Sequence, residues 1–324
     1  MPALIDIARS GFTGIRTTPV VERAIRSYLV NSAIMNLMSF KNIGMASNIG
    51  NLQVTYKMTS SPGTAGNRKI GEEYTPDNQV STPVTVGLKA IGGAFSTDRI
   101  LGRAFPGGSA GMDVWTEEQV ALKLDAIANG FALKFVKGSA TTDADDFDGL
   151  SVYLAANSGQ VNATPYDIVG GLTDAEVIKT EKHLNLSINS IRRGVKPNRI
   201  ITTLTGKALL QTLNAIRQRA VNTVRVNDAD YDMYMGIPIV DLSDDCFPTT
   251  DLTDDKIPVY FIYVSDTDGI FTAVPADGKI VDIGLPKLDS GLVVNPGFCE
   301  MWSAPIFQHY KVASKCFITE SAAV

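Results

Sequence analysis

Apolar residues recur at helical spacing between Asp113 and Gly138. Five of them lie four, three, four and four residues apart, which places them on one side of a helix with 3.6 residues per turn: Val120, Leu124, Ile127, Phe131 and Phe135. Thr116 and Gln119 have the spacing of a capping box, and Gly138 suits a left-handed cap. The pattern predicts one helix about 33 Å long, either the spine of a domain or an ordinary core helix.

Two alternating runs of apolar and polar residues flank a polar stretch nearer the N-terminus. Residues 52–58 and 84–90 each place apolar side chains on one face, as strands do. Thr59–Asn67 is rich in Ser, Thr and Gly, and charged residues follow to Glu73. We predict a long β-hairpin with an irregular tip. A two-stranded ribbon is marginally stable alone in water, so it needs a surface, either on a neighbouring subunit or on its own domain.

The segments around these elements are less regular. Residues 1–17 are interpreted as an extended arm, and Thr18-Pro19 as the start of a helix that continues to about Met38. We expect a short turn or helix over 96–101. A tight turn is expected over Phe147–Leu150, and a loop over 157–167.

Residues 172–275 predict a compact α/β module. A Thr173/Glu176 capping box opens a helix that ends at Gly194. The elements expected after it are a strand over Arg199–Leu204, a helix capped by Thr205 with Leu209, Leu210, Leu213 and Ile216 inward, a turn and strand over Gly236–Val240, and strands over Val259–Val264 and Ile270–Val274. From Lys279 onward, residues 292–295 and 306–318 have strand character.

Composition favours a folded protein of more than one module. The chain has 324 residues, of which 44% are hydrophobic and 19% charged. A net charge of -5 argues against a dedicated nucleic-acid binder, although a wall that encloses nucleic acid is compatible with it. The three cysteines are far apart, which argues against a disulfide framework and a zinc site: Cys246, Cys299 and Cys316. No apolar run approaches the roughly 20 residues of a membrane span.

One short motif raises the question of hydrolase chemistry. Gly107–Gly111 matches the nucleophile-elbow pattern G-x-S-x-G, with Ser109 as the nucleophile. That motif requires a preceding strand, and Ala104-Phe105-Pro106 is a poor one. A triad also needs a histidine, and the chain has only His183 and His309. We therefore favour a flexible glycine loop over a serine hydrolase.

Charged clusters are interpreted as solvated turns or faces. Asp143, Asp145, Asp146 and Asp148 lack the ligand order of a calcium loop, and Asp266 and Asp268 precede a turn glycine. Two basic clusters fit ion pairs within or between subunits better than phosphate sites: Arg192, Arg193, Lys196 and Arg199, and Arg217, Arg219 and Arg225. Neither a Walker motif nor G-x-G-x-x-G occurs, so nucleotide binding has no support. We expect no catalytic, cofactor or metal residues.

The order of the elements resembles the major capsid proteins of tailed bacteriophages, which share the Hong Kong 97-type shell fold. The resemblance rests on the arm, the hairpin, the spine helix, the turn at Phe147–Leu150, and the strand, helix and Gly-Ile-Pro-Ile-Val turn of the α/β module. It implies an α+β fold with five segments: an N-terminal arm (1–50), an extended hairpin loop (51–98), a peripheral domain with the spine helix (99–171), an axial α/β domain (172–278) and C-terminal strands that return to the peripheral domain (279–324).

The resemblance also implies a function. Copies of the chain would form hexamers and pentamers of an icosahedral shell around double-stranded DNA, bound without sequence specificity. Portal, a separate scaffolding protein and a decoration protein are the expected partners, with no membrane. The location is the virion, assembled in the host cytoplasm. Some members cross-link a loop lysine to an asparagine of another subunit. Lys57 and Lys69 lie in the loop, but no motif identifies a partner, so this chemistry is not carried over.

Two other functions remain open from the sequence. An encapsulin-type nanocompartment shell has the same fold and encloses enzymes instead of a genome. A serine hydrolase using Ser109 is the remote alternative from another class.

Overall fold

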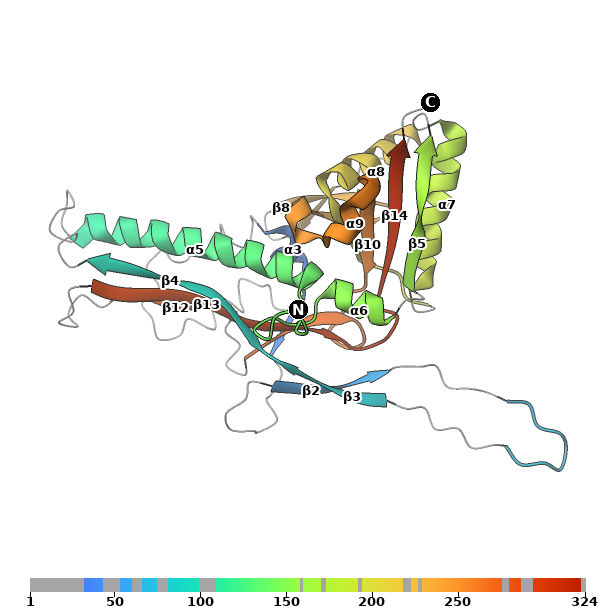
Figure 1. The fold of residues 1–324 in the computed structure, drawn as a ribbon, viewed down its shortest axis with the longest axis horizontal. Helices are drawn as coiled ribbons and strands as arrows, with labels where there is room; N and C mark the ends of the chain where they lie inside the picture. The colour runs from blue at the N-terminus through green and yellow to red at the C-terminus, as the bar shows by residue number, and fades with distance from the viewer. Residues whose placement is uncertain are drawn as a thin grey trace.

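The described residues of the computed structural model form three β-sheets, two of which carry helices (Figure 1). The structure describes residues 32–42, 53–59, 66–74, 81–98, 109–157, 160–169, 173–191, 194–217, 223–226, 229–275, 280–286 and 294–321. The predicted arm and the predicted helix start at Thr18 lie outside these residues. No helix among the described residues is long and apolar enough to span a membrane.

A five-stranded sheet supports the long helix α5 (Ser109–Lys137). Its central strand is β13 (Val294–Phe307), which pairs with strands on both sides. The other strands are β1 (Phe40–Asn42), β4 (Lys89–Asp98), β11 (Ile270–Val274) and β12 (Asp282–Gly284). The helix runs along β4 and β13, as Figure 1 shows. The short turn or helix expected over 96–101 is wrong for residues 96–98. These residues belong to β4, which pairs with β13 in unbroken register over 89–98.

The spine helix is confirmed, with two corrections at its ends. Its five predicted core residues are all buried. It begins at Ser109, so Thr116 lies inside the helix and does not cap it; no proline interrupts residues 109–116, and one glycine is tolerated in a helix. Gly138 does follow the last helical residue, but its φ is not positive. A close approach of two backbone segments, not a left-handed cap, requires a glycine there.

A seven-stranded sheet forms the second layer, with α7 (Asp174–Ser190) and α8 (Leu204–Ile216) packed on it (Figure 1). Its strands, in spatial order, are β5 (Val161–Val169), β14 (Ala313–Ser321), β10 (Ile257–Ile262), β6 (Arg199–Thr203), β9 (Ile237–Leu242), β8 (Ala229–Tyr234) and β7 (Thr223–Val226). Strands predicted at β6, β9 and β10 are confirmed. Strand β5 replaces the loop expected over 157–167, because those residues pair with β14.

Helix ends in this module differ in detail from the prediction. Thr173 caps α7 as expected, and its side chain accepts from Glu176 N at 3.4 Å. The Glu176 carboxylate accepts from Tyr166 and Lys179, so it does not complete the box. Thr203, not Thr205, caps α8: its hydroxyl accepts from Gly206 N at 3.1 Å. Strand β6 therefore ends one residue earlier than expected.

Two strands lie in the sheet opposite to the one expected from their position in the chain. Strand β11 follows the α/β strands in sequence, yet it pairs with β1 and β13 of the five-stranded sheet. Strand β14 was expected beside the spine helix, yet it lies between β5 and β10. The chain thus passes to the five-stranded sheet at residues 263–269 and returns to the seven-stranded sheet at residues 308–312.

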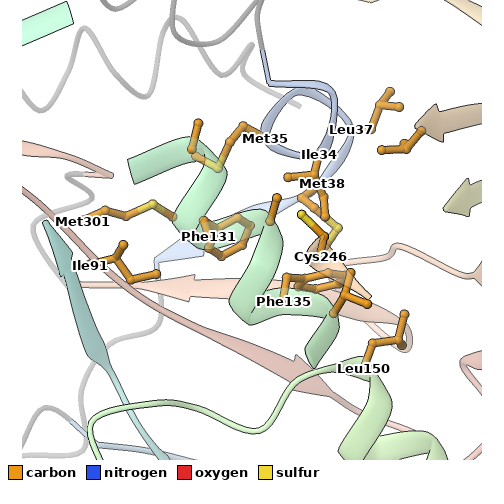
Figure 2. Packing of buried hydrophobic residues seen from close by; sticks show 14 of the residues in the cluster. Ile34, Met35, Leu37, Met38, Ile91, Phe131, Phe135, Leu150, Cys246 and Met301 are labelled. Carbon is orange, nitrogen blue, oxygen red and sulfur yellow. The ribbon is translucent and has the colours of Figure 1, made fainter. Parts of the chain in front are cut away.

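One apolar core connects the two sheets. It contains the buried face of α5 together with residues on the inner face of the seven-stranded sheet, such as Ile201, Tyr260 and Ile262. Figure 2 shows Phe131 and Phe135 of α5 beside Met35, Met38 and Cys246 from other elements. A second core lies between that sheet and helices α7 and α8. Because the first core is continuous, the two layers form one body.

Short elements complete this body. They are α3 (Ala33–Leu37), α6 (Leu150–Ala156), η2 (Asp244–Cys246), α9 (Thr249–Leu252) and η3 (Thr253–Asp255). The predicted helix from Thr18 to Met38 is not continuous, because Ser32 is extended and caps α3 through its side chain. The residues after the Phe147–Leu150 turn form α6.

Candidate assembly surfaces

The predicted hairpin exists as a two-stranded ribbon. β2 (Gln53–Thr59) and β3 (Ser81–Gly87) pair antiparallel from Gln53↔Gly87 to Thr59↔Ser81. Its base rests on the five-stranded sheet through a small apolar cluster: Val54, Leu88, Phe271, Ala273, Ala304 and Ile306. The base therefore packs on its own domain, which was one of the two alternatives left open by the sequence.

The far part of the ribbon is different. Residues 66–74 lie at the end of the long projection in Figure 1. Ile70 is fully exposed and Tyr74 is 65% exposed. The segment still has local order: Arg68 donates to Glu72 O at 2.8 Å and lies over the Tyr74 ring, and Gly71 adopts φ +94°. The turn is thus locally ordered, and it exposes the side chains of Ile70 and Tyr74 to solvent.

A second apolar surface lies on the five-stranded sheet. Alternate residues of β4 and β13 face away from α5 and are exposed, and we call this surface the open face: Ala90, Ala94, Val294, Pro296 and Phe298. Phe298 packs against Gly284 of β12, where a Cβ atom would lie 2.2 Å from its ring. Sequence reasoning missed this surface because Pro296 and Gly297 interrupt the strand pattern.

Helix α7 presents further apolar residues to solvent. Ile178 and Leu186 are 56% and 57% exposed, and they lie eight residues apart, about 12 Å along the helix axis. Their helix also packs on β5 and β14 through Val177 and Leu184. The α/β module therefore adds a third surface on which apolar side chains face outward.

The residues proposed for a hydrolase do not come together. Ser109 begins α5, so about 43 Å of helix separates it from Lys137. His309 lies near the other end of α5, where its carbonyl accepts from Tyr153 of α6 at 2.7 Å. His183 lies in α7, with its Nδ1 3.3 Å from Asn162 Nδ2 and its ring against Tyr166. The described residues thus assemble no Ser–His pair around Ser109.

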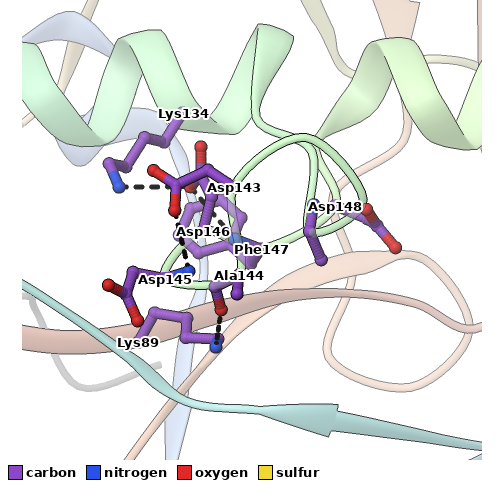
Figure 3. A network of polar contacts seen from close by, with 9 residues as sticks. Lys89, Lys134, Asp143, Ala144, Asp145, Asp146, Phe147 and Asp148 are labelled. Carbon is purple, nitrogen blue, oxygen red and sulfur yellow. Dashed lines mark hydrogen bonds and ion pairs between the residues drawn. The ribbon is translucent and has the colours of Figure 1, made fainter.

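The acidic residues after α5 form a closed turn, as predicted (Figure 3). Asp143 accepts from Asp145 N, and Asp148 accepts from Ala140 N, each at 2.9 Å. Asp146 accepts from Phe147 N and lies 3.3 Å from Lys134 Nζ. The carboxylates are therefore used by the turn itself. In addition, Lys89 donates to Ala144 O at 2.5 Å, which ties the turn to the base of the ribbon.

The other charged clusters serve contacts within the chain. Arg217 pairs with Glu181 at 3.1 Å, and Arg199 donates to Leu37 O at 3.1 Å. Asp266 accepts from Ser39 and Asp268 accepts from Ser265, which supports the turn interpretation. Lys196 and Arg225 are exposed. Arg192, Arg193 and Arg219 lie outside the described residues.

The described residues contain neither a reactive cysteine nor a cluster of metal-binding side chains. The three cysteines are buried and free. Burial raises the pKa of Cys299 to about 11 and that of Cys316 to about 12, so both thiols stay protonated and unreactive at neutral pH. Within the described residues, no group of three or more His, Cys, Asp or Glu side chains could hold a metal ion.

Comparison with known proteins identifies the fold. No protein-family profile and no curated protein sequence matches the chain. Solved structures do. A subunit of the holo-SrpI encapsulin complex from Synechococcus elongatus has a TM-score of 0.51 and 11% identity, over 93% of this chain and 88% of that chain. A subunit of the capsid of an empty GTA particle has a TM-score of 0.55 and 10% identity, over 89% and 90%. A chain from Mycobacterium phage Bobi has a TM-score of 0.55 and 11% identity, over 90% of both chains.

The chain has the Hong Kong 97-type shell fold. In this shell fold, α5 is the spine helix and the β2–β3 ribbon is the extended loop. The fold class predicted from the sequence is confirmed. Sequence identities of 10% and 11% support a shared fold and carry no statement about function.

Proposed function

We propose that the chain is a major capsid protein whose copies form the hexamers and pentamers of an icosahedral shell around double-stranded DNA. In this proposal residues 1–50 are the arm, 51–98 the extended loop, 99–171 the peripheral domain, 172–278 the axial domain and 279–324 the C-terminal strands. The protein is a structural subunit without catalytic activity. Portal, a separate scaffolding protein and a decoration protein are its partners, and it is assembled in the host cytoplasm into the virion.

The observation that carries the proposal is the ribbon. Its base is anchored on its own sheet, while Ile70 and Tyr74 at its far end are exposed. Burying a side chain of isoleucine size contributes about 1.5–3 kcal/mol, so a partner surface that covers this tip gains substantially at each contact. Many identical chains that overlap in this way add up to the large obligate interfaces of an assembly.

Replacing the tip tests the proposal. Thr59 and Ser81 pair in register, so residues 60–80 can be replaced by Asn-Gly, which favours a tight hairpin turn. We expect a folded, soluble subunit, by circular dichroism, that forms no closed shells by negative-stain electron microscopy. Ile70→Asp is the point variant, and Ile70→Leu is its apolar control. Normal particles from the shortened ribbon would contradict the proposal.

An encapsulin-type shell is the second candidate, favoured by the similarity to the encapsulin subunit. The two functions differ in what the shell contains. Particles recovered from the cells that naturally make this protein are expected to hold nuclease-protected double-stranded DNA. Particles with protein cargo and no genome would assign the chain to the encapsulin type.

A further inference from the structure

An ion pair lies buried between the last strand and the short helix α9. Lys315 Nζ of β14 is 2.9 Å from both carboxylate oxygens of Asp251. The two side chains are 11% and 7% exposed. In the other described ion pairs the lysine side chains are 22–61% exposed. This is therefore the most completely buried lysine pair among the described residues.

Aromatic rings surround the pair. Lys315 Nζ lies 5.4 Å from the centroid of the Tyr260 ring and 5.0 Å from that of Phe317. Phe247 stacks on Tyr260 at 5.9 Å. Tyr260 is fully buried and donates its hydroxyl hydrogen to Asp251 Oδ2. Burial raises the pKa of Tyr260 well above its ordinary value, so the phenol keeps its proton and remains a donor. The rings shield the pair from solvent, and the Tyr260 hydroxyl polarises the carboxyl group.

The position of the two groups suits a reaction between them. Both carboxylate oxygens lie 2.9 Å from Lys315 Nζ, so a proton can pass directly from the nitrogen to the carboxylate as the reaction begins. A buried ion pair has also lost the hydration that would stabilise its charges in water. Groups fixed in this way react as if at effective concentrations of about 10⁵ M or more. Exclusion of water also favours condensation, since water is the product.

We propose that Lys315 and Asp251 join in an intramolecular isopeptide bond. After the proton passes from Nζ to Oδ1, the amine nitrogen attacks Asp251 Cγ and a C–N bond forms. The Cγ–Oδ1 bond then breaks, and Oδ1 leaves as water with the transferred proton and a second proton from the nitrogen. Oδ2 becomes the amide oxygen and keeps the hydrogen bond from Tyr260. The ammonium and carboxylate are thus converted into one amide and one water, with no change in net charge and no oxidant.

The bond has a structural consequence. It closes a loop from residue 251 to residue 315 across the seven-stranded sheet, and a cross-link of this kind reduces the entropy of the unfolded chain. The reaction takes place within one subunit. It does not depend on the proposed shell function, so either proposal can fail while the other stands.

Intact mass spectrometry of the denatured full chain tests the proposal. After folding at neutral pH, the wild-type mass is expected to be lower than the sequence mass by one water molecule. Digestion should release a branched peptide that joins residues 251 and 315. Folded wild-type protein with the full sequence mass would overturn the inference. Lys207 and Asp241, 3.0 Å apart but partly exposed, are the internal control and are expected to remain unlinked.

Three variants define the chemistry. Lys315→Met is expected to have its full mass. Asp251→Asn is expected to lose one ammonia instead of one water, because the leaving group changes. Tyr260→Phe keeps the ring and removes the hydroxyl, so bond formation should slow at least tenfold in a time course after refolding. Linkage at the wild-type rate in Tyr260→Phe would overturn the role given to that hydroxyl.

Discussion

Gly138 follows α5 at a position where a larger residue would clash with the backbone. A Cβ atom on Gly138 would lie 2.4 Å from Lys134 O and 2.7 Å from Phe147 O. Gly149 is equally confined, and its N–H donates to Gly138 O at 2.9 Å. Two backbone segments therefore meet without side chains between them, which fixes where the acidic turn leaves the helix.

Gly138→Ala is expected to destabilise the subunit by about 2 kcal/mol, because backbone atoms must move to admit the methyl group. Urea unfolding followed by circular dichroism measures the change. Gly66→Ala is the matched control, since a Cβ atom there meets nothing within 4 Å. An equal effect of both substitutions would show that the close approach at Gly138 is not the cause.

Burial of His183 predicts a pH dependence of stability. Loss of hydration lowers the pKa of His183 in the folded protein. The unfolded chain then binds the proton more readily, so the free energy of unfolding falls as pH drops below the unfolded pKa of about 6.5. Wild type is expected to lose more stability than His183→Gln between about pH 7.5 and 5.5. Parallel pH profiles of the two proteins in urea titrations would refute this.

At the level of elements, a helix cap offers a direct comparison of neighbouring residues. The Thr203 hydroxyl accepts from Gly206 N and is buried, whereas Thr205 is exposed inside the first turn of α8. Thr203→Ala should therefore lower the free energy of unfolding by about 1 kcal/mol, and Thr205→Ala should change it little. Thermal or urea unfolding measures both. A larger effect at Thr205 would restore the cap expected from the sequence.

Elements with a strong local signal were predictable. Helices α5, α7 and α8 follow from apolar spacing, and β6, β9 and β10 follow from continuous apolar runs between turn residues. Strand β5 was not predictable, because Val161–Val169 carries a proline and polar residues and derives its conformation from pairing with β14. The sheet to which β11 or β14 belongs depends on pairing with strands distant in the chain. The local sequence pattern of each strand therefore does not reveal it.

The candidate surfaces were predictable only in part. The hairpin and its need for support follow from residues 52–58 and 84–90. That its base would pack on Phe271 and Ile306 does not, because those residues are more than 180 positions away in the chain. The sequence analysis did not single out Ile70, because it is one apolar residue in a charged stretch and its exposure depends on the fold.

At the scale of the whole molecule, the continuous core predicts cooperative unfolding. Phe131 is fully buried at the centre of the core that joins the two sheets, in ring contact with Phe40, Phe135 and Phe147. Phe131→Ala should cost about 3–5 kcal/mol and move a single thermal transition to lower temperature. Leu122→Ala, at an exposed position of the same helix, should cost less than about 0.5 kcal/mol. Two separate transitions would contradict a shared core.

The core shared by the two sheets also bears on how subunits could fit a curved shell. In a closed polyhedron built from one kind of chain, fivefold and sixfold positions require different dihedral angles between neighbours. A body with one shared interior has few internal hinges with which to adjust. The ribbon joins that body through a separate cluster of six buried apolar residues. In the proposed shell, we therefore expect the tilt between neighbours to be accommodated by the ribbon, while the rest of each subunit keeps the same conformation.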